Sequence, residues 1–357
     1  MDTRLLVDAP EFWASLRSDL AEARRRAFVQ TFTFEGDRVG AALGRALRLC
    51  RARDRRLLVD GYSLLVHNDR VIVGPAWARR RFRREVFHTH AWVARLRGEG
   101  VGVRFSNPVG PAPTRLVRRN HKKLVVVDDA VYLGGINFSE HNFAWHDMMI
   151  RLESPDLADR LAQDFDASWL GRPTTMDEVI GPVRLISLNG RGNARGFDPV
   201  VAAIASATRS IDVQSAYLSP PFTRHLVEAA GRGVAVSVLT PADNNKANLG
   251  HHIVESASGH PVRVLHQSGM SHLKAMVIDG ELLIAGSSNF DAMSYHILEE
   301  LIVVSSEPRI VDEYRRRVWA PDCAASRAPR GSRGLRSRLG DLAVRAGARV
   351  ARLLARY

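Results

Sequence analysis

The order of apolar and polar segments along the chain occurs twice. A segment from Phe28 reads FVQTFTFEGDRVGAALGRAL, and a second, from Ile211, reads IDVQSAYLSPPFTRHLVEAAGRGVAVSVLTP. Each predicts a buried strand, an amphipathic helix and a second strand. Later in each half, two short apolar runs joined by a polar turn predict a hairpin, which a helix follows. Two copies of one α/β unit are the simplest explanation of this repeat.

The two halves differ in length between the first strand and the hairpin. Gln30 is 91 positions before His121, whereas Gln214 is 58 positions before His272, so the first half contains an insertion of 33 residues. We place it around residues 78–96, where apolar residues at helical spacing predict a helix with arginines on its other side. These apolar residues are Phe82, Val86, Phe87, Trp92 and Val93. A solvated basic face is the simpler interpretation of the arginines, and contact with an anionic lipid or phosphate is the alternative.

Prolines, glycines and polar residues interrupt the pattern at residues 171–182, GRPTTMDEVIGP, which indicates a linker between the halves. We therefore expect a first domain over residues 1–175 and a second over residues 176–322. Residues 323–357 form an arginine-rich tail. The expected fold class is α/β, with two pseudo-symmetric domains that each contain a mixed sheet flanked by helices.

The composition agrees with a globular protein of this size. The 357 residues are enough for about two domains. With 45% hydrophobic and 25% charged residues, a wholly disordered or collagen-like chain is excluded. No window approaches the ~18 consecutive apolar residues of a membrane span, and the first residues lack the apolar core of a signal peptide. We therefore expect the protein to stay in the cytoplasm. Cys50 and Cys323 lack metal-ligand spacing and are expected to be idle thiols.

The charge of the chain is unevenly distributed. A net charge of +13 indicates an anionic partner, either nucleic acid or an acidic membrane surface. Much of it lies in the last 31 residues, which contain nine arginines and one acid, Asp341. Of the 51 basic residues only four are lysines, namely Lys122, Lys123, Lys246 and Lys274. A lysine is therefore a rare choice in this sequence.

Two of these lysines belong to a repeated motif. Residues 121–138 read HKKLVVVDDAVYLGGINF, and residues 272–290 read HLKAMVIDGELLIAGSSNF. Both contain His-x-Lys-x4-Asp, a pair of small residues and then Asn-Phe. Roughly 0.01 copies of His-x-Lys-x4-Asp are expected by chance in this chain, so coincidence is a poor explanation.

The motif places a histidine beside an ammonium group. On a strand, alternate residues share a face, so His121 and Lys123 point together while Lys122 points away. His272 and Lys274 repeat this arrangement. Lysine holds an anionic phosphate as a point charge, and an imidazole can attack or transfer a proton near neutral pH. The pattern therefore indicates chemistry on a phosphate group.

The two copies resemble the paired HKD motifs, HxKx4Dx6GSxxN, of the phospholipase D superfamily. The segments GGINFSEHN, WHDMMIRLESP and GSSNFDAMSYHILEEL are similar to its bacterial cardiolipin synthase-like branch. The resemblance covers about residues 28–319. It implies two phospholipase D-like domains with the active site at their interface, and a two-step displacement at phosphorus that needs no metal and no cofactor.

The resemblance also implies roles for individual residues. One motif histidine forms a phosphohistidine intermediate, while the other protonates the leaving alcohol and then activates the acceptor. By family analogy His121 is the nucleophile and His272 is the acid and base, although the sequence itself is nearly symmetric between the two assignments. The residues expected to neutralise charge on the phosphate oxygens are Lys123, Lys274, Asn137 and Asn289.

Acidic residues are expected to orient the histidines by accepting from the ring nitrogen that does not react. Family matching places them at Asp147 and Glu300, with Glu299 as the adjacent alternative. Asp128 and Asp279 complete the two catalytic motifs, and we expect them to hold the hairpin turns through side-chain to backbone bonds.

The chain also departs from the family pattern. The first hairpin turn is one residue shorter than the second, so Asn137 follows its aspartate by nine positions and Asn289 follows its own by ten. Met293 and Leu298 stand where the family usually has Arg and Asn. Contacts to the acceptor and the placement of Asn137 are the features that these changes affect.

The arginine-rich tail has the pattern of an amphipathic helix. Apolar residues recur there at spacings of three and four, and most arginines lie elsewhere on the helix. The apolar residues are Leu335, Leu339, Leu342, Ala346, Val350, Leu353 and Tyr357. Such a helix would lie in the interface of an anionic bilayer, whereas a disordered tail or a nucleic-acid patch is the alternative. We expect a peripheral protein on the cytoplasmic side of the cell membrane.

The leading hypothesis is a phosphatidyltransferase of cardiolipin synthase type. It would transfer a phosphatidyl group from a phospholipid to the hydroxyl of phosphatidylglycerol. Hydrolysis of phospholipids or of nucleic acid is the second hypothesis, but the chain lacks an evident aromatic stacking platform, which disfavours nucleic acid. A non-catalytic lipid-binding or nucleic-acid-binding module is the third, and two complete His-x-Lys pairs oppose it. Because one chain carries both motifs, a monomer is sufficient for the active site.

Overall fold

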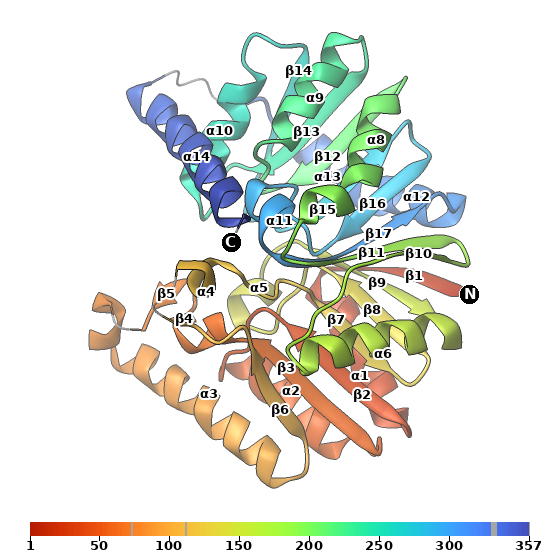
Figure 1. Cartoon of the computed structure of the whole chain (residues 1–357), viewed down its shortest axis with the longest axis vertical. Helices are drawn as coiled ribbons and strands as arrows, with labels where there is room; N and C mark the ends of the chain where they lie inside the picture. Colours follow the sequence, from red (N-terminus) through yellow and green to blue (C-terminus); the bar gives the residue numbers. More distant parts are fainter. Residues whose placement is uncertain (73, 111–112, 330–333, 357) are drawn as a thin grey trace. The chain divides into compact units, whose positions relative to one another are not determined.

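The apolar runs of the two repeats form the central strands of two separate sheets (Figure 1). The structure is a computed structural model that describes residues 1–72, 74–110, 113–329 and 334–356. The chain divides into two compact units, Met1–Thr174 and Thr175–Tyr357. Each unit contains one mixed sheet flanked by helices, so the expected α/β fold class is confirmed.

The first unit is built on one seven-stranded sheet. Its strands are β1 (Asp2–Val7), β2 (Arg26–Thr31), β3 (Asp54–Asp60), β6 (Gly102–Ser106), β7 (Leu124–Val127), β8 (Ala130–Gly134) and β9 (Met148–Glu153). They lie in the order β1-β9-β8-β7-β2-β3-β6. β2, β3 and β6 run parallel, and all other neighbours are antiparallel. The sheet is therefore mixed, as expected.

Helices on both faces bury the sheet of the first unit. The helices of this unit are α1 (Asp8–Glu22), α2 (Arg38–Leu49), α3 (Arg80–Gly98), α4 (Pro113–Val117), α5 (Glu140–Phe143) and α6 (Pro155–Trp169). A two-stranded ribbon, β4 (Val66–His67) and β5 (Arg70–Val71), and the single turns Gly61–Leu64 and Pro75–Ala78 lie between β3 and α3. Phe12 and Leu43 project from α1 and α2 into a core with Val29 and Val125 of the sheet, all fully buried or nearly so. Each such side chain contributes about 1.5–3 kcal/mol by leaving water.

The second unit repeats this plan on an eight-stranded sheet. Its strands are β10 (Met176–Ile180), β11 (Val183–Asn189), β12 (Ser210–Ser215), β13 (Ala235–Pro241), β14 (Val262–Gln267), β15 (Lys274–Ile278), β16 (Leu282–Gly286) and β17 (Glu299–Ser305). The order β17-β16-β15-β12-β13-β14 matches β9-β8-β7-β2-β3-β6 of the first unit. β11 lies beside β17 as β1 lies beside β9, so the internal repeat includes these strands, and β10 adds an edge strand in the second unit alone.

Eight helices and one π-helical turn, Arg315–Trp319, accompany this sheet in the described residues. The helices are α7 (Asn193–Gly196), α8 (Asp198–Ser206), α9 (Phe222–Gly231), α10 (Ala247–Ala257), α11 (Ala292–His296), α12 (Pro308–Tyr314), α13 (Ala320–Ala325) and α14 (Leu335–Leu354). Of the helices that the structure describes, none is both long enough and apolar enough to cross a membrane.

Residues 171–182 differ from the sequence-based prediction of a linker. They contain β10, which pairs in antiparallel register with β11, from Met176 opposite Ser187 to Ile180 opposite Val183. Only Met176 of this strand is buried. An edge strand with one neighbour needs few apolar residues, and for that reason its sequence resembled a loop.

The inserted helix α3 also differs in detail from its prediction. Phe82, Val86 and Val93 are buried, as helical periodicity requires, and Trp92 packs partly against the same core. Phe87, which the sequence assigned to this apolar stripe, is instead 62% exposed. It directly follows Val86 and so points about 100° away from the stripe.

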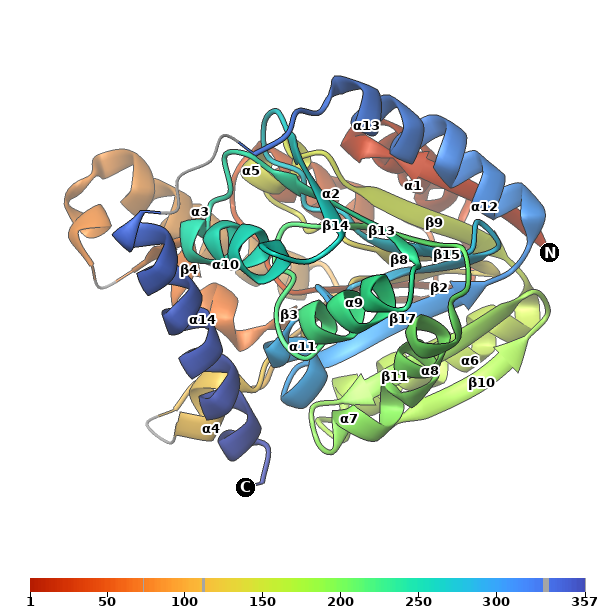
Figure 2. The ribbon, with the colours of Figure 1, turned by 90° about the horizontal axis from the view of Figure 1, so that it is seen from above.

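The C-terminal segment belongs to the second unit, where α14 lies alongside α10 (Figure 2). A Cβ atom added at Gly340 would lie 3.3 Å from the side chain of His251, so only a very small residue allows the two helices to approach this closely. Asp341 Oδ1 lies 2.7 Å from Nδ1 of the buried His252, and the Ser337 hydroxyl donates to Glu255 Oε2 at 3.4 Å. Contacts of small and polar residues therefore hold α14 against α10. The predicted Tyr357 position lies outside the described residues.

Candidate functional site

Strand register brings the parts of each motif to one end of its sheet. In the first unit, Leu124 lies opposite both Gln30 and Leu133, so the residues before β7, the end of β2 and the end of β8 meet at this end. His121 and Lys123 immediately precede Leu124, and Asn137 follows β8. The corresponding end of the second sheet carries the other motif, because Lys274 lies opposite Ser215 and Ala275 opposite Ala285.

The histidines and lysines of both motifs are buried. His121 and His272 are 7% and 5% exposed, and Lys123 and Lys274 are 1% and 2% exposed. Lys123 Nζ donates to the carbonyl oxygen of His121 at 2.7 Å, and Lys274 Nζ donates in the same way to the carbonyl oxygen of His272. Each ammonium group is thus held beside its own histidine.

Aromatic rings pack against both histidines, a feature that the sequence did not predict. Phe32, in the segment after β2, contacts His121 edge to face with ring centres 5.1 Å apart. Tyr217, in the segment after β12, contacts His272 in the same way at 5.7 Å. Both rings come from the segment that follows the first strand of their repeat, but Phe32 is two positions after Gln30 and Tyr217 is three after Gln214, so an alignment of the repeats does not pair them. They limit the orientations that each imidazole can adopt.

The motif asparagines are held by neighbouring polar groups. Asn137 Nδ2 donates to Asn142 Oδ1 at 3.2 Å, and the Thr31 hydroxyl donates to Asn137 Oδ1 at 3.4 Å. In the second unit the backbone N–H of Asn289 donates to the Ser294 hydroxyl at 3.4 Å. Among the described residues, Oδ1 of the buried Asn289 has no hydrogen-bond partner. A buried amide of this kind is suited to a ligand with a complementary polar group.

The predicted orienting acids have different surroundings in the two units. Glu300 accepts hydrogen bonds from the hydroxyls of Ser287 and Ser294, the latter at 2.6 Å. Asp147 Oδ1 accepts from the backbone N–H of Met148 at 2.8 Å. Both carboxylates are buried, as is that of Glu299, at the same sheet end as the motifs. Their role in orienting the histidines stays a prediction.

The Gly135→Ser substitution tests how the surroundings of Asp147 in the first unit differ from those of Glu300 in the second. Ser287 occupies the equivalent position in the second copy, but a Cβ added at Gly135 would lie 2.3 and 2.5 Å from the two Asp147 carboxylate oxygens. We expect Gly135→Ser to displace Asp147 and to destabilise the protein by about 2 kcal/mol. Chemical unfolding would measure this, with Ser287→Gly as the matched exchange in the other copy. Unchanged stability of Gly135→Ser would contradict the described packing.

The motif aspartates lie at the opposite end of their strands. Asp128 accepts from the backbone N–H groups of residues 24–26, and Asp279 accepts from those of residues 208–210. Burial alone would raise the pKa of Asp279, but these donors and the Thr208 hydroxyl outweigh it and lower the pKa to about 2. The four residues of β7 lie between Lys123 and Asp128, so these two residues are about 15 Å apart. Both aspartates thus join the hairpin to the start of the first strand, and a purely structural role for them stays a prediction.

The one-residue difference between the hairpins is visible in the strand register. Val127 pairs with Ala130 across a two-residue turn, whereas Ile278 pairs with Leu282 across a three-residue turn. Gly280, in the middle of the longer turn, has a φ of 72°, a left-handed conformation that glycine adopts readily. The shorter turn therefore changes only the distal end of the hairpin, and Asn137 keeps its place after β8.

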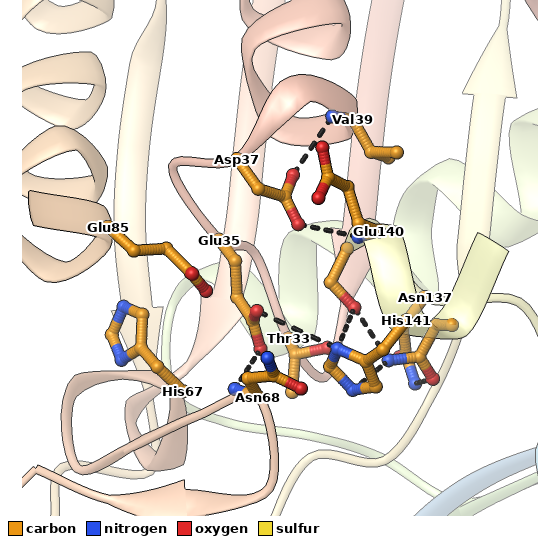
Figure 3. A network of polar contacts seen from close by, with 12 residues as sticks. Thr33, Glu35, Asp37, Val39, His67, Asn68, Glu85, Asn137, Glu140 and His141 are labelled. Atoms are coloured by element: carbon orange, nitrogen blue, oxygen red, sulfur yellow. Dashed lines mark hydrogen bonds and ion pairs between the residues drawn. The ribbon is translucent and has the colours of Figure 1, made fainter. Parts of the chain in front are cut away.

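A polar network that the sequence did not predict extends from Asn137 (Figure 3). Asn142 accepts a hydrogen bond from Asn137, and its own Nδ2 lies 2.7 Å from Nε2 of His141. His141 Nδ1 lies 3.7 Å from Oε2 of the buried Glu35, whose Oε1 accepts from the backbone N–H of Asn68 at 2.9 Å. Burial raises the pKa of Glu35 to about 9 and lowers that of His141, so both side chains are uncharged at neutral pH. Glu35 and Asn68 come from loops and His141 and Asn142 from α5, and no spacing in the sequence connects these segments.

The raised pKa of Glu35 gives a prediction for stability. Between pH 4.5 and about 9 the unfolded chain ionises Glu35 while the folded protein keeps it protonated, so this group lowers stability as the pH rises. Glutamine has the shape of the protonated acid and does not ionise. We expect Glu35→Gln to be more stable than the parent by about 2 kcal/mol at pH 7.5 and by much less at pH 5. Urea unfolding at the two pH values would show a constant difference if this account were wrong.

Comparison with known proteins identifies the family. A family model described as "Cardiolipin synthase, PLD-like domain" matches residues 16–169 and 200–320. Cardiolipin synthase A of Pseudomonas putida (strain W619) is 27% identical over 341 residues, which cover 87% of this chain and 66% of the relative. Cardiolipin synthase B of Salmonella typhi is 24% identical over 338 residues, which cover 84% and 76%. The chain thus spans about two thirds of the length of the first of these relatives.

A solved structure shares the fold. The crystal structure of phosphatidylserine synthase from Haemophilus influenzae Rd KW20 superimposes with a TM-score of 0.69 at 13% identity, covering 99% of this chain and 94% of that one. The family model covers most of the chain and both copies of the His-x-Lys motif. The chain therefore belongs to the cardiolipin synthase family of phospholipase D-like domains.

Proposed function

We propose that the protein is a phosphatidyltransferase of cardiolipin synthase type. It transfers a phosphatidyl group from one phospholipid to the hydroxyl of phosphatidylglycerol. The observation that carries this proposal is the duplicated constellation: in each unit a buried histidine, its neighbouring lysine and an asparagine lie at one end of the sheet. The family match and the cardiolipin synthases among the relatives support it.

The proposed reaction has two displacements at phosphorus. In the first, an imidazole nitrogen of His121 forms a bond to phosphorus as the bond to the head-group alcohol breaks, and His272 gives its proton to the departing oxygen. In the second, His272 takes the proton of the acceptor hydroxyl, whose oxygen attacks phosphorus and releases His121. The proposal requires the two motifs to face one phosphate group, as in-line displacement demands.

The lysines and asparagines neutralise the charge that develops on the non-bridging oxygens. Lys123 and Lys274 supply fixed ammonium groups in a buried setting, where electrostatic stabilisation is stronger than in water. Asn137, held by Thr31 and Asn142, supplies a neutral amide. All of these groups are side chains of the protein itself, and the proposed steps route no electron or proton through a cofactor.

The activity test incubates the purified protein with phosphatidylglycerol vesicles in the presence of a metal chelator. The proposal predicts cardiolipin and one free glycerol for each cardiolipin formed. Phosphatidic acid with glycerol, and no cardiolipin, would instead identify a phospholipase. Cleavage of DNA with no reaction of the lipid would overturn the proposal.

We further propose that the protein is peripheral on the cytoplasmic face of the membrane and that α14 contacts the bilayer. α14 packs on α10 through Ser337 and Gly340, both buried, and it also contacts α11. Large apolar residues on its other side are exposed: Leu335 (74%), Leu339 (55%), Leu342 (61%), Val350 (52%) and Leu353 (55%). Arginines lie beside this stripe, as an interfacial helix on anionic lipid requires.

Flotation with phosphatidylglycerol vesicles tests the role of α14. Leu339→Ser with Leu342→Ser removes apolar surface and leaves the contacts with α10 intact. We expect about tenfold weaker binding. Val179→Ser, which alters another strongly exposed apolar residue at 72% exposure, is the control and should bind normally. Equal binding of all three proteins would rule out this contact.

A further inference from the structure

The insertion of the first unit, from β5 to α3, exposes two aromatic rings that touch each other. Trp77 is 37% exposed and Phe87 is 62% exposed, and their ring centres lie 6.4 Å apart. Val71 of β5 is 52% exposed. Single exposed apolar residues are ordinary in soluble proteins, but two large rings packed together at the surface call for an explanation. The apolar residues that fix α3 to the core are others, Phe82 and Val86 among them.

The same segment is strongly basic. Five arginines occur between Arg79 and Arg84, and the nearest acid along the helix is Glu85. Arg80, Arg83 and Arg84 lie seven, four and three residues before Phe87, so they share its side of α3. Arg83 Nη1 also donates to the carbonyl oxygen of Trp77 at 2.6 Å, which ties the turn carrying Trp77 to the helix carrying Phe87.

A recess of about 480 Å³ lies in the turn that carries Trp77. It is lined by Arg70, Val71, Gly74, Pro75, Ala76 and Arg79. Among the described residues, two arginines and no carboxylate line it. A concave site with guanidinium groups and no acid suits a phosphate group, because guanidinium binds phosphate oxygens in pairs.

We propose that this segment is a second membrane-docking surface, which we call the insertion surface: Val71, Trp77, Phe87 and the arginines Arg70, Arg79, Arg80 and Arg83. Trp77 and Phe87 enter the interface of an anionic bilayer, and the arginines bind lipid phosphates, with one head group in the recess. Tryptophan suits this position because its ring is amphipathic. The inference goes beyond the proposed function, whose membrane contact is α14 in the other unit.

The chemistry of the insertion surface favours a lipid surface over a nucleic acid. Bases stack on aromatic faces that stand apart and open to solvent. Trp77 and Phe87 instead pack against each other at an interplanar angle of 54°, which forms one compact apolar patch beside the arginines. An apolar patch with a basic border matches the boundary between acyl chains and anionic head groups.

Vesicle sedimentation with full-length protein tests the proposal. The vesicles contain phosphatidylcholine alone or phosphatidylcholine with 30% phosphatidylglycerol. We expect Trp77→Ser with Phe87→Ser to weaken binding to the anionic vesicles about tenfold. Arg70→Ala with Arg79→Ala should weaken it at least about fivefold and reduce its dependence on salt. The control is Leu170→Ser, which removes a residue of matching exposure, 63%, in the same unit and should bind as the parent does.

A fluorescence measurement reports insertion directly. Brominated phosphatidylglycerol quenches tryptophans that enter the bilayer, so the parent protein should be quenched and Trp77→Phe should lose much of that quenching. Unchanged quenching in Trp77→Phe, or unchanged vesicle binding in Trp77→Ser with Phe87→Ser, would overturn the proposal. So would loss of DNA binding in that double variant while its vesicle binding stayed normal.

The test separates this inference from the proposed function. Transfer between short-chain lipids dispersed in detergent needs no bilayer, so Trp77→Ser with Phe87→Ser should form cardiolipin there at the parental rate. Absence of cardiolipin from the parent protein, with vesicle binding still dependent on Trp77 and Phe87, would refute the proposed function and support the insertion surface. Normal transfer with binding independent of both residues would refute the insertion surface alone.

Discussion

Replacing His121 or His272 by alanine is expected to lower cardiolipin formation by about 10⁴-fold or more. Loss of the nucleophile removes the covalent route, and loss of the acid leaves an alkoxide as the leaving group. Each histidine lies beside a buried lysine at the end of its sheet, where the proposed mechanism gives it a role of its own. Product analysis by mass spectrometry would measure the effect.

A variant that lacks both histidines shows whether His121 and His272 act together or independently. If the two histidines act on one phosphate, His121→Ala with His272→Ala should be scarcely slower than either single variant. His260→Ala changes an exposed histidine and should retain full activity. Activity within about tenfold of the parent in either single variant would exclude the two-histidine mechanism.

Asp164→Ala is expected to destabilise the protein by about 3–5 kcal/mol, the largest effect on stability that we predict. Lys122 Nζ lies 2.8 and 2.9 Å from the two carboxylate oxygens of Asp164 on α6, and both side chains are completely buried. Removal of the acid leaves an ammonium group in the core without its counter-charge. Urea unfolding of the parent and the variant would measure the difference.

The second repeat supplies the matched control. Leu273 is buried at the position equivalent to Lys122, so an apolar residue is compatible with this site. We expect Lys122→Leu with Asp164→Leu to recover most of the lost stability, because it removes both charges. Since Lys122 points away from His121 and Lys123, this double variant should also keep its activity, in contrast to Lys123→Leu. A loss of less than about 1 kcal/mol in Asp164→Ala would contradict the described ion pair.

Much of the fold was predictable because the repeat is local and periodic. The strand that enters at Phe28 and the hairpin after His121 reappear at Ile211 and His272 with the same alternation of apolar residues. Alternation also predicts that Lys122 points away from His121 and Lys123, although nothing in the sequence indicates Asp164 as its partner. Asp164 lies 42 positions later on a helix, and a single sequence does not encode such a pairing by spacing.

The features that the sequence did not reveal depend on tertiary contacts. Helical periodicity alone assigns Phe87 to the buried stripe, because it cannot show where the core ends. β10 was interpreted as a linker because an edge strand exposes most of its side chains. Glu35, in a loop, and His141, on α5, are 106 positions apart, and only the folded chain brings them together beside Asn142. The motif placed Asp128 and Asp279 at the hairpin turns, but it did not indicate that their partners are the backbone N–H groups of residues 24–26 and 208–210.

The stereochemical course of transfer is the most direct test of the central claim, a double displacement through a phosphohistidine. Phosphatidylglycerol with a chiral phosphorothioate would serve as donor, and the configuration at phosphorus in the product would be determined. Each in-line displacement inverts phosphorus, so two successive displacements predict net retention. Net inversion would show that the acceptor attacks the donor directly, and it would contradict the proposed roles of His121 and His272.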